Sequence, residues 1–392
     1  METAHTMDQP AAAENQATTN SSVDILFDSV PFGKVTLPNR VVMAPMTRSQ
    51  SPGHVPNERN VEYYRRRAEG GVGLIITEGT NPGHPAAGGY PDVPVFDGDE
   101  ALEGWKHIVD AVHDAGSFII PQLWHCGSIR QPGMQPDPAV PGFGPSPIVH
   151  PSLAQKEDAQ APHEMTQKDI DDTVESYARS AGHAKDLGFD GVEIHGAHSY
   201  LIDQFFWEAT NQRTDDYGGP KLKQRMRFAV EVVEAIRGRV GDEFPIVFRF
   251  SQWKQGDYKH KMVKNPDEFK AFLDPLAEAG VDWFHASNRR FWDAEFEGSE
   301  LNLAGWCTEL TGKPAITVGS VGLDSDFLRS YAGKESNKQG LDKLVARLEN
   351  KEFELVAVGR ALLSDAEWVN KVHERREDEI VGFEPKHMGV YP

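Results

Sequence analysis

Residues 166–200 read TQKDIDDTVESYARSAGHAKDLGFDGVEIHGAHSY, one helix and one strand of a regular α/β pattern. Thr166 is a good N-cap for an amphipathic helix that runs to Leu187. The apolar run 191–194 predicts a short buried strand that ends at His195. Two histidines and a tyrosine lie within the six residues 195–200. The stretch therefore predicts a helix, a buried strand, and polar chemistry where that strand ends.

The same alternation runs along the rest of the chain. Other apolar, β-rich runs predict strands over residues 41–43, 72–77, 118–122, 246–250, 283–286, 315–318 and 355–358. Amphipathic patterns between them predict helices over residues 57–68, 102–115, 225–239, 266–279 and 340–349. Eight strands alternating with helices indicate a single parallel (β/α)₈ TIM barrel. A doubly wound open sheet is the alternative, and no Gly-x-Gly-x-x-Gly follows the first strand to support it.

The chain is longer than a plain barrel, which needs about 250 residues. We expect loop insertions after strands three, five and six, over residues 126–164, 252–264 and 288–305. All three would overhang the face where such barrels place their chemistry. We expect a disordered tail over residues 1–22, the barrel with a short N-terminal lid over 23–375, and a C-terminal tail over 376–392.

Bulk properties exclude several classes of protein. The formal net charge of -20 argues against nucleic-acid partners and anionic membrane surfaces. No apolar run approaches the roughly 18 residues that span a bilayer, and the first 22 residues lack the apolar core of a signal peptide. Cys126 and Cys307 are the only cysteines, which fits a reducing cytoplasm. We expect a cytoplasmic protein that acts on a small molecule.

The residues after the fourth strand carry the strongest chemical signal. His195 and His198 can both reach one small polar atom, and the Tyr200 phenol can approach the same bound molecule from another side. This set suits polarising an oxygen and delivering one proton. A zinc site is the alternative, but zinc needs three or four ligands and no Cys, Asp or Glu set joins the pair. Roles in capping and core packing also stay open.

Hydrogen-bonding or small residues end several other strands. Thr47 follows the first strand, Gly79 the second, Gln122 ends the third, and Arg249 lies on the fifth. A flat heterocycle with several carbonyl and N–H groups needs such a ring of partners. Taken singly, each residue is also typical of an ordinary cap or core amide.

Two glycine-containing turns follow the last strands. Gly319-Ser320-Val321-Gly322 comes after the seventh strand and Gly359-Arg360 after the eighth. Phosphate sites recur at these places in the barrel fold, where glycines let backbone N–H groups close on the anion. Arg360 adds a planar cation suited to phosphate. Tight turns that enter helices are the alternative.

Four motifs occur in a recognisable order: APMTR (44–48), HGAHSY (195–200), LIDQFF (201–206) and NQRTDDYGG (211–219). With them the chain resembles the old yellow enzyme family of FMN-dependent ene-reductases, over about residues 24–368. The resemblance implies FMN as cofactor and NADH or NADPH as reductant. It also implies hydride transfer to the β-carbon of an α,β-unsaturated carbonyl or nitro compound.

The resemblance implies a role for each matching residue. His195 and His198 would bind the substrate oxygen, Tyr200 would protonate the α-carbon, and no residue would bind a metal. Trp124 would line the substrate space. Arg249 would stabilise the negative charge that the flavin gains on reduction. The FMN contacts would come from Pro45, Met46, Thr47, Gly79, Gln122, Arg249, Gly319, Ser320, Val321, Gly359 and Arg360.

Two loops depart from the family pattern. Residues 122–130 read QLWHCGSIR where many relatives have a shorter His-x-Gly-Arg, and residues 250–255 read FSQWKQ where a Ser-Pro-type turn is common. Both loops border the substrate mouth, so the substrate stays open. The direction of the reaction stays open too, since the same site suits dehydrogenation of a saturated ring or ketone. A metal-dependent hydrolase or lyase that uses the two histidines is the alternative from another class.

Overall fold

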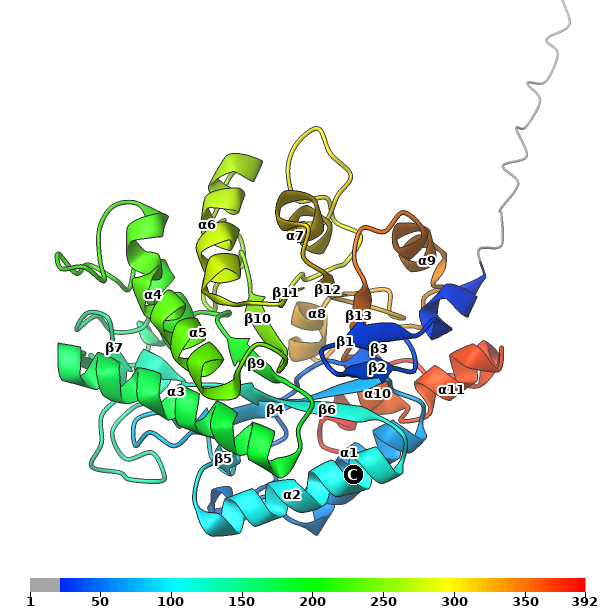
Figure 1. Ribbon diagram of the computed structural model, residues 1–392, viewed down its shortest axis with the longest axis horizontal. Helices are drawn as coiled ribbons and strands as arrows, with labels where there is room; N and C mark the ends of the chain where they lie inside the picture. Colours follow the sequence, from blue (N-terminus) through cyan, green and yellow to red (C-terminus); the bar gives the residue numbers. More distant parts are fainter. Residues whose placement is uncertain (1–21, 392) are drawn as a thin grey trace, which may run out of the picture.

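Eight parallel strands close into a barrel in this computed structural model, which describes residues 22–391 (Figure 1). Neighbours pair in the order β3-β4-β6-β9-β10-β11-β12-β13, and β13 pairs with β3 to close the ring. The strands are β3 (Val41–Met43), β4 (Leu74–Pro82), β6 (Phe118–Leu123), β9 (Val192–His195), β10 (Ile246–Phe250), β11 (Trp283–Ala286), β12 (Ala315–Val318) and β13 (Leu355–Val358). The predicted (β/α)₈ barrel is confirmed, and the open sheet is wrong.

Helices surround the barrel and follow its strands (Figure 1). The longer ones are α1 (Glu58–Glu69), α2 (Asp99–Asp114), α3 (Gln167–Leu187), α5 (Arg227–Val240), α6 (Pro266–Ala279), α7 (Leu303–Thr311) and α9 (Asp342–Glu349). Their starts follow from local chemistry. The side chains of Asn57 and Thr166 accept hydrogen bonds from the first turns of α1 and α3, and Pro266 opens α6 after the Asn265 cap.

Short elements fill the connections. Four short helices are α4 (Leu201–Phe206), α8 (Phe327–Tyr331), α10 (Arg360–Ser364) and α11 (Trp368–His373). Minor strands are β1 (Val30–Phe32), β2 (Val35–Leu37), β5 (Val95–Phe96), β7 (Phe143–Gly144) and β8 (His163–Glu164). Single 3₁₀ turns are η1 (Val23–Phe27), η2 (Pro52–His54), η3 (Gly127–Ile129), η4 (Pro151–Leu153), η5 (Leu222–Met226), η6 (Glu377–Glu379) and η7 (Pro385–Met388).

The β1–β2 hairpin closes one end of the barrel. Phe32 and Leu37 are fully buried against inward-facing strand residues such as Val42 and Leu74. The turn at Gly33 has a φ of 58°, and a Cβ there would lie 2.5 Å from the ring of Pro245, just before β10. The hairpin therefore covers the amino-terminal ends of the strands, as the short N-terminal lid. The opposite end stays available for a site.

The structure departs from the sequence prediction at some boundaries. Strand β4 continues to Pro82, five residues beyond the predicted end at Thr77. These added residues are polar or small yet fully enclosed by their neighbours, so hydropathy did not mark them as a strand. The insertion expected over 288–305 overlaps the start of α7, which begins at Leu303 behind an Asn302 cap.

The end of the described chain lies against α1 and the loop after β3. The Tyr391 ring stacks on Tyr63 with centroids 4.8 Å apart, and Arg48 donates a 2.6 Å hydrogen bond to the carbonyl of Val390. Within residues 22–391 no helix combines the length and apolarity needed to cross a bilayer. The tail expected over residues 1–22 lies, apart from Ser22, outside the described residues.

Candidate functional site

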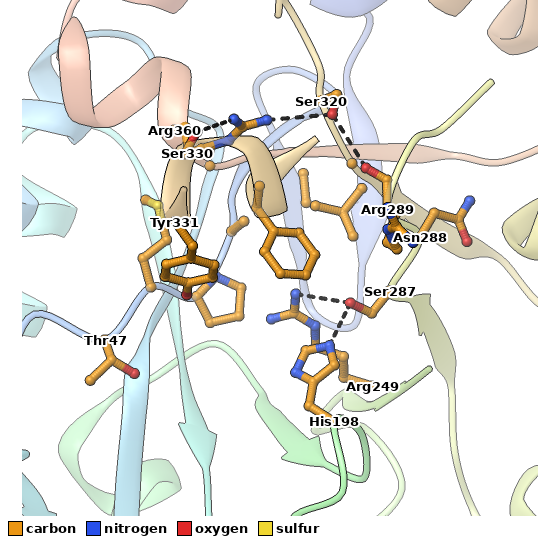
Figure 2. A pocket seen from close by; sticks show the side chains of 18 of the residues that line it. Thr47, His198, Arg249, Ser287, Asn288, Arg289, Ser320, Ser330, Tyr331 and Arg360 are labelled. Carbon is orange, nitrogen blue, oxygen red and sulfur yellow. Dashed lines mark hydrogen bonds between the residues drawn. The ribbon is translucent and has the colours of Figure 1, made fainter. Parts of the chain in front are cut away.

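A cavity of about 450 Å³ opens at the carboxyl ends of the barrel strands. Loops after seven of the eight strands contribute to its lining, and Figure 2 shows how several of these side chains converge. Nearly every residue that the sequence predicted for the site is in this lining. They are Pro45, Met46, Thr47, Gln122, Trp124, His195, His198, Tyr200, Arg249, Gly319, Ser320, Val321, Gly359 and Arg360.

Gly79 is the predicted site residue that is not in the cavity lining. It lies in β4, where the pairing with β6 is irregular between Ile76 and Gly79. A Cβ at Gly79 would approach Cε3 of Trp124 to 2.2 Å, too close for any real contact. Gly79 thus makes room for the Trp124 ring, which itself faces the cavity.

The end of β9 places His195, and a strained turn behind it places His198. His198 and Ser199 have φ values of 61° and 58°, in the left-handed region that non-glycine residues rarely adopt. Asp203 accepts a 2.6 Å hydrogen bond from the Ser199 N–H, and Lys254 forms a fully buried ion pair with the same carboxylate. Ser251 accepts a 3.0 Å hydrogen bond from the His198 N–H. These contacts hold the turn in its unusual conformation.

The two imidazoles are close together and neutral. Their ring centroids lie 5.0 Å apart, and His198 stacks on Trp253 at 4.4 Å. Burial holds the pKa of both rings well below the usual range, and the charge of Arg249 lowers both further. Each ring therefore carries one N–H at neutral pH. His198 Nε2 lies 2.7 Å from Ser287 Oγ, whereas the buried Nδ1 of His195 has no partner among the described residues.

Tyr200 faces the same space from the start of α4. Its ring lies 5.3 Å from His195 and makes an edge contact with Trp124 at 4.8 Å. Burial raises its pKa well above the usual value, so the phenol is protonated at neutral pH. Its oxygen lies 2.9 Å from Tyr90 Oη and 2.9 Å from Gln255 Nε2. Sequence reasoning missed both partners. Gln255 lies in the 250–255 segment that departs from the family pattern, but nothing marked Tyr90.

A buried polar chain lies beneath the cavity. Gln122 Nε2 donates a 2.6 Å hydrogen bond to Glu193, and the other oxygen of Glu193 lies 2.5 Å from His285 Nδ1. Glu193 and His285 are fully buried and were also missed, because residues inside an apolar strand read as core. Since one amide N–H of Gln122 is used by Glu193, its carbonyl oxygen remains available as an acceptor.

Arg249 brings a positive charge to the lining of the cavity. Burial lowers its pKa and Glu193 opposes the effect, and a guanidinium stays protonated under any ordinary condition. One amino group lies 3.4 Å from Ser287 Oγ, while the buried Nε has no partner among the described residues. A cation with an unused N–H at the edge of a cavity suits an anionic or carbonyl-bearing ligand.

Arg360 and Arg289 lie at the end of the cavity opposite His198 (Figure 2). Gly319 and Gly359 also line the cavity. Arg360 donates hydrogen bonds to Ser330 Oγ at 2.6 Å and Ser320 Oγ at 3.4 Å. Gly319 has a φ of 122°, and a Cβ there would lie 2.7 Å from a backbone carbonyl. Arg289 also lines the cavity and pairs with Asp326 at 2.5 Å. Sequence reasoning missed Arg289, whose charge is balanced by Asp326.

These features fit FMN. Thr47 and Gln122 bring polar groups to the cavity, and Arg249 has an unused N–H. A Cβ on Gly359 would project toward Met46 Sδ at 3.5 Å, so its absence keeps that space open. Arg360, next to the Arg289–Asp326 ion pair, lies where the phosphate would be expected. Among residues 22–391, no group of three or more His, Cys, Asp or Glu side chains gathers to hold a metal.

Comparison with known proteins identifies relatives of the chain. A family model described as the NADH:flavin oxidoreductase / NADH oxidase family matches residues 25–379. An NADH oxidase of Thermoanaerobacter brockii is 33% identical over 365 residues, which cover 91% of this chain and 52% of that protein. 12-Oxophytodienoate reductase 2 of Arabidopsis thaliana is 37% identical over 65% of this chain and 68% of its own length. The chain spans about half the length of several curated relatives that it matches.

Solved structures similar to this chain include a reductase and an Old Yellow Enzyme. Morphinone reductase in complex with tetrahydroNAD is 30% identical with a TM-score of 0.74, over 93% of both chains. An Old Yellow Enzyme from a Pichia species is 26% identical with a TM-score of 0.76, over 93% of this chain and 90% of its own.

Proposed function

Because this chain belongs to the NADH:flavin oxidoreductase / NADH oxidase family, the old yellow enzymes, we propose that it reduces the double bond of an α,β-unsaturated carbonyl or nitro compound. FMN is its cofactor. Bound in the cavity, it would supply the chemistry of hydride transfer from NADH or NADPH to the β-carbon of the substrate. The chain's own side chains then bind the substrate oxygen and supply the proton.

The observation that carries this proposal is the placement of His195, His198 and Tyr200 around one part of the cavity. Both imidazoles are neutral, so each offers an N–H without burying an ionic charge. Two such donors on one carbonyl or nitro oxygen stabilise the negative charge that develops there as the β-carbon gains its hydrogen. Strand β9 holds His195, and the strained turn at His198 and Ser199 holds His198 before the substrate arrives.

Tyr200 provides the proton. Its phenol is neutral at neutral pH and lies beside the histidine pair, 5.3 Å from the His195 ring centre. A substrate whose oxygen is held by the histidines presents its α-carbon to this hydroxyl, and the proton moves from Tyr200 to carbon. Trp124 packs against the Tyr200 ring and limits the positions it can take beside the cavity.

The remaining site residues would hold FMN. Gln122 would accept a hydrogen bond from the ring through its free carbonyl oxygen, and Arg249 would place a fixed cation beside the ring. Arg360 and the backbone of Gly319 and Ser320 would bind the phosphate, where glycines allow close approach of N–H groups.

Replacing Tyr200 by Phe tests the proton transfer. Bleaching of the FMN absorbance by NADH or NADPH should stay nearly normal, because that half-reaction needs no phenol. Its recovery with a simple enone should slow by about 10²- to 10⁴-fold, as for a lost general acid. A nitroalkene, whose anion is stable enough to take a proton from water later, should be much less affected. Stopped-flow absorbance measures all three rates.

The matched control for this experiment is Tyr63→Phe, which removes a buried hydroxyl that has no partner among the described residues and is not in the cavity lining. Equal slowing of both half-reactions in the Tyr200 variant would assign it a structural role. If the protein dehydrogenates a saturated ketone, with an electron acceptor present, faster than it reduces any enone, the reaction runs in the direction opposite to the one proposed. A purified protein that neither contains nor takes up FMN would refute the proposal.

Replacing the histidines tests the oxygen-binding role. His195→Ala and His198→Ala should each weaken binding of a simple phenol, whose oxygen mimics the developing anion. Because the two rings act on one oxygen, the double variant should lose less binding free energy than the sum of the single variants. Titration of the FMN absorbance with phenol measures these affinities. Unchanged phenol affinity in both single variants would contradict the role.

A further inference from the structure

Three loops from different parts of the barrel meet at the Tyr200 hydroxyl. Tyr90 comes from the loop between β4 and β5, and Gln255 from the loop after β10. Tyr90 Oη and Gln255 Nε2 each lie 2.9 Å from Tyr200 Oη. The proton transfer proposed above needs only one phenol, so the two additional polar groups require an explanation.

The hydrogen-bonding capacity of a phenol indicates what the two groups do. A phenol oxygen donates one hydrogen bond and accepts up to two. The amide nitrogen of Gln255 can only donate, so Tyr200 accepts there. If Tyr90 donates as well, the proton of Tyr200 is left free to point into the cavity. If Tyr200 instead donated its proton to Tyr90, that proton would not point into the cavity.

The same two donors matter more after the proton has left. A phenolate buried beside Trp124 is costly unless N–H or O–H groups point at it. Two donors at 2.9 Å satisfy it, and hydrogen bonds to a charged oxygen are about twice as strong as neutral ones. Burial raises the pKa of Tyr90 to about 12, so Tyr90 remains a protonated donor at neutral pH.

Packing keeps both donors in place. The Tyr90 ring stacks on Trp124 with centroids 5.3 Å apart, and Trp124 in turn contacts the Tyr200 ring. The backbone N–H of Gln255 donates to Ser199 Oγ at 3.2 Å, next to the strained turn. The adjacent Lys254 is anchored by its buried ion pair, so the Gln255 side chain starts from a fixed backbone.

We propose that Tyr90 and Gln255 are positioning residues that hold the Tyr200 proton toward the substrate and stabilise the phenolate that remains. This inference rests on the proposed function. In the step itself, the O–H bond of Tyr200 breaks, a C–H bond forms at the α-carbon, and the oxygen keeps the electron pair. The phenolate later regains a proton from water, so the protein returns to its starting state.

A fluorinated tyrosine at position 200 tests the effect on ionisation without any turnover. Fluorine lowers the intrinsic pKa of the phenol enough to titrate it by ¹⁹F NMR. Tyr90→Phe keeps the ring stack and removes one donor, and Gln255→Leu removes the other. In the holoenzyme each change should raise the pKa of the fluorinated phenol, whereas the Tyr63→Phe control should leave it unchanged. The two variants are independent, so misfolding of one leaves the other informative.

Kinetics test the effect on the reaction in chains with the natural Tyr200. Each variant should slow reoxidation by an enone by about 10- to 100-fold, the loss of one hydrogen bond to a charged group. Reoxidation by a nitroalkene and reduction by NADH or NADPH should stay near normal. An unchanged fluorotyrosine titration in both variants would overturn the inference. If the variants raise the pKa of the fluorinated phenol but the protein reduces no enone, the role of Tyr90 and Gln255 as donors is supported. The proposed function is then overturned instead.

Discussion

Removing the amino group of Lys254 should destabilise the whole site. Lys254 and Asp203 form an ion pair in which both side chains are 0% exposed, and Asp203 also accepts the Ser199 N–H at 2.6 Å. Lys254→Met keeps an unbranched side chain that is one atom shorter, and leaves a buried carboxylate without its counter-charge. Breaking a buried pair in this way costs about 3–5 kcal/mol. We expect a loss of that size in the free energy of unfolding at about pH 8, measured by urea denaturation.

The pH dependence gives this prediction a second test. Burial raises the pKa of Asp203, and the charge of Lys254 opposes that rise, so the variant should have a still higher pKa at Asp203. A carboxyl whose folded pKa is raised costs stability only as pH rises above its unfolded value, about 3.9. The variant should therefore lose less stability at about pH 5 than at about pH 8.

Two further variants act as controls. Lys270→Met makes the same change at the exposed pair with Asp274 and should cost about 1 kcal/mol or less. Combining Lys254→Met with Asp203→Asn removes the orphaned charge and keeps an acceptor for the Ser199 N–H, so part of the loss should be recovered. If Lys254→Met costs no more than Lys270→Met at either pH, the buried pair does not hold the turn.

Two other predictions concern FMN binding and pH. Arg249→Met should weaken FMN retention by about 10-fold or more, the value of one charge-assisted hydrogen bond, as measured by fluorescence titration of the apoprotein; equal affinity would remove Arg249 from the FMN site. Burial raises the pKa of Glu78 from 4.5 to about 7, so this carboxyl should cost the wild-type protein about 3 kcal/mol of stability as pH rises across that interval. In urea denaturation the stability of Glu78→Gln relative to wild type should therefore increase over the same interval, and a difference that does not change with pH would contradict the assignment.

Local sequence determined much of the barrel. The bounds of β10, β11, β12 and β13 match the predicted strands, because each is a short, mostly apolar run bracketed by polar residues, proline or glycine. Helix α6 begins and ends where predicted, since Asn265 and Pro266 define its start and Gly280 follows its last residue. The late residues of β4 were missed because polar residues became buried through neighbours that lie far away in sequence.

The candidate site also has one part that the local sequence predicted and one part that it did not. His195, His198 and Tyr200 belong to one continuous motif, so their proximity follows from a strand and the turn behind it. Tyr90 and Gln255 lie 110 and 55 residues from Tyr200, and each sits in a loop with no pattern of its own. Residue type and spacing encode local conformation, but only closure of the barrel brings the ends of separate strands to one edge. Which loop residues then touch depends on packing, and tertiary structure alone decided it.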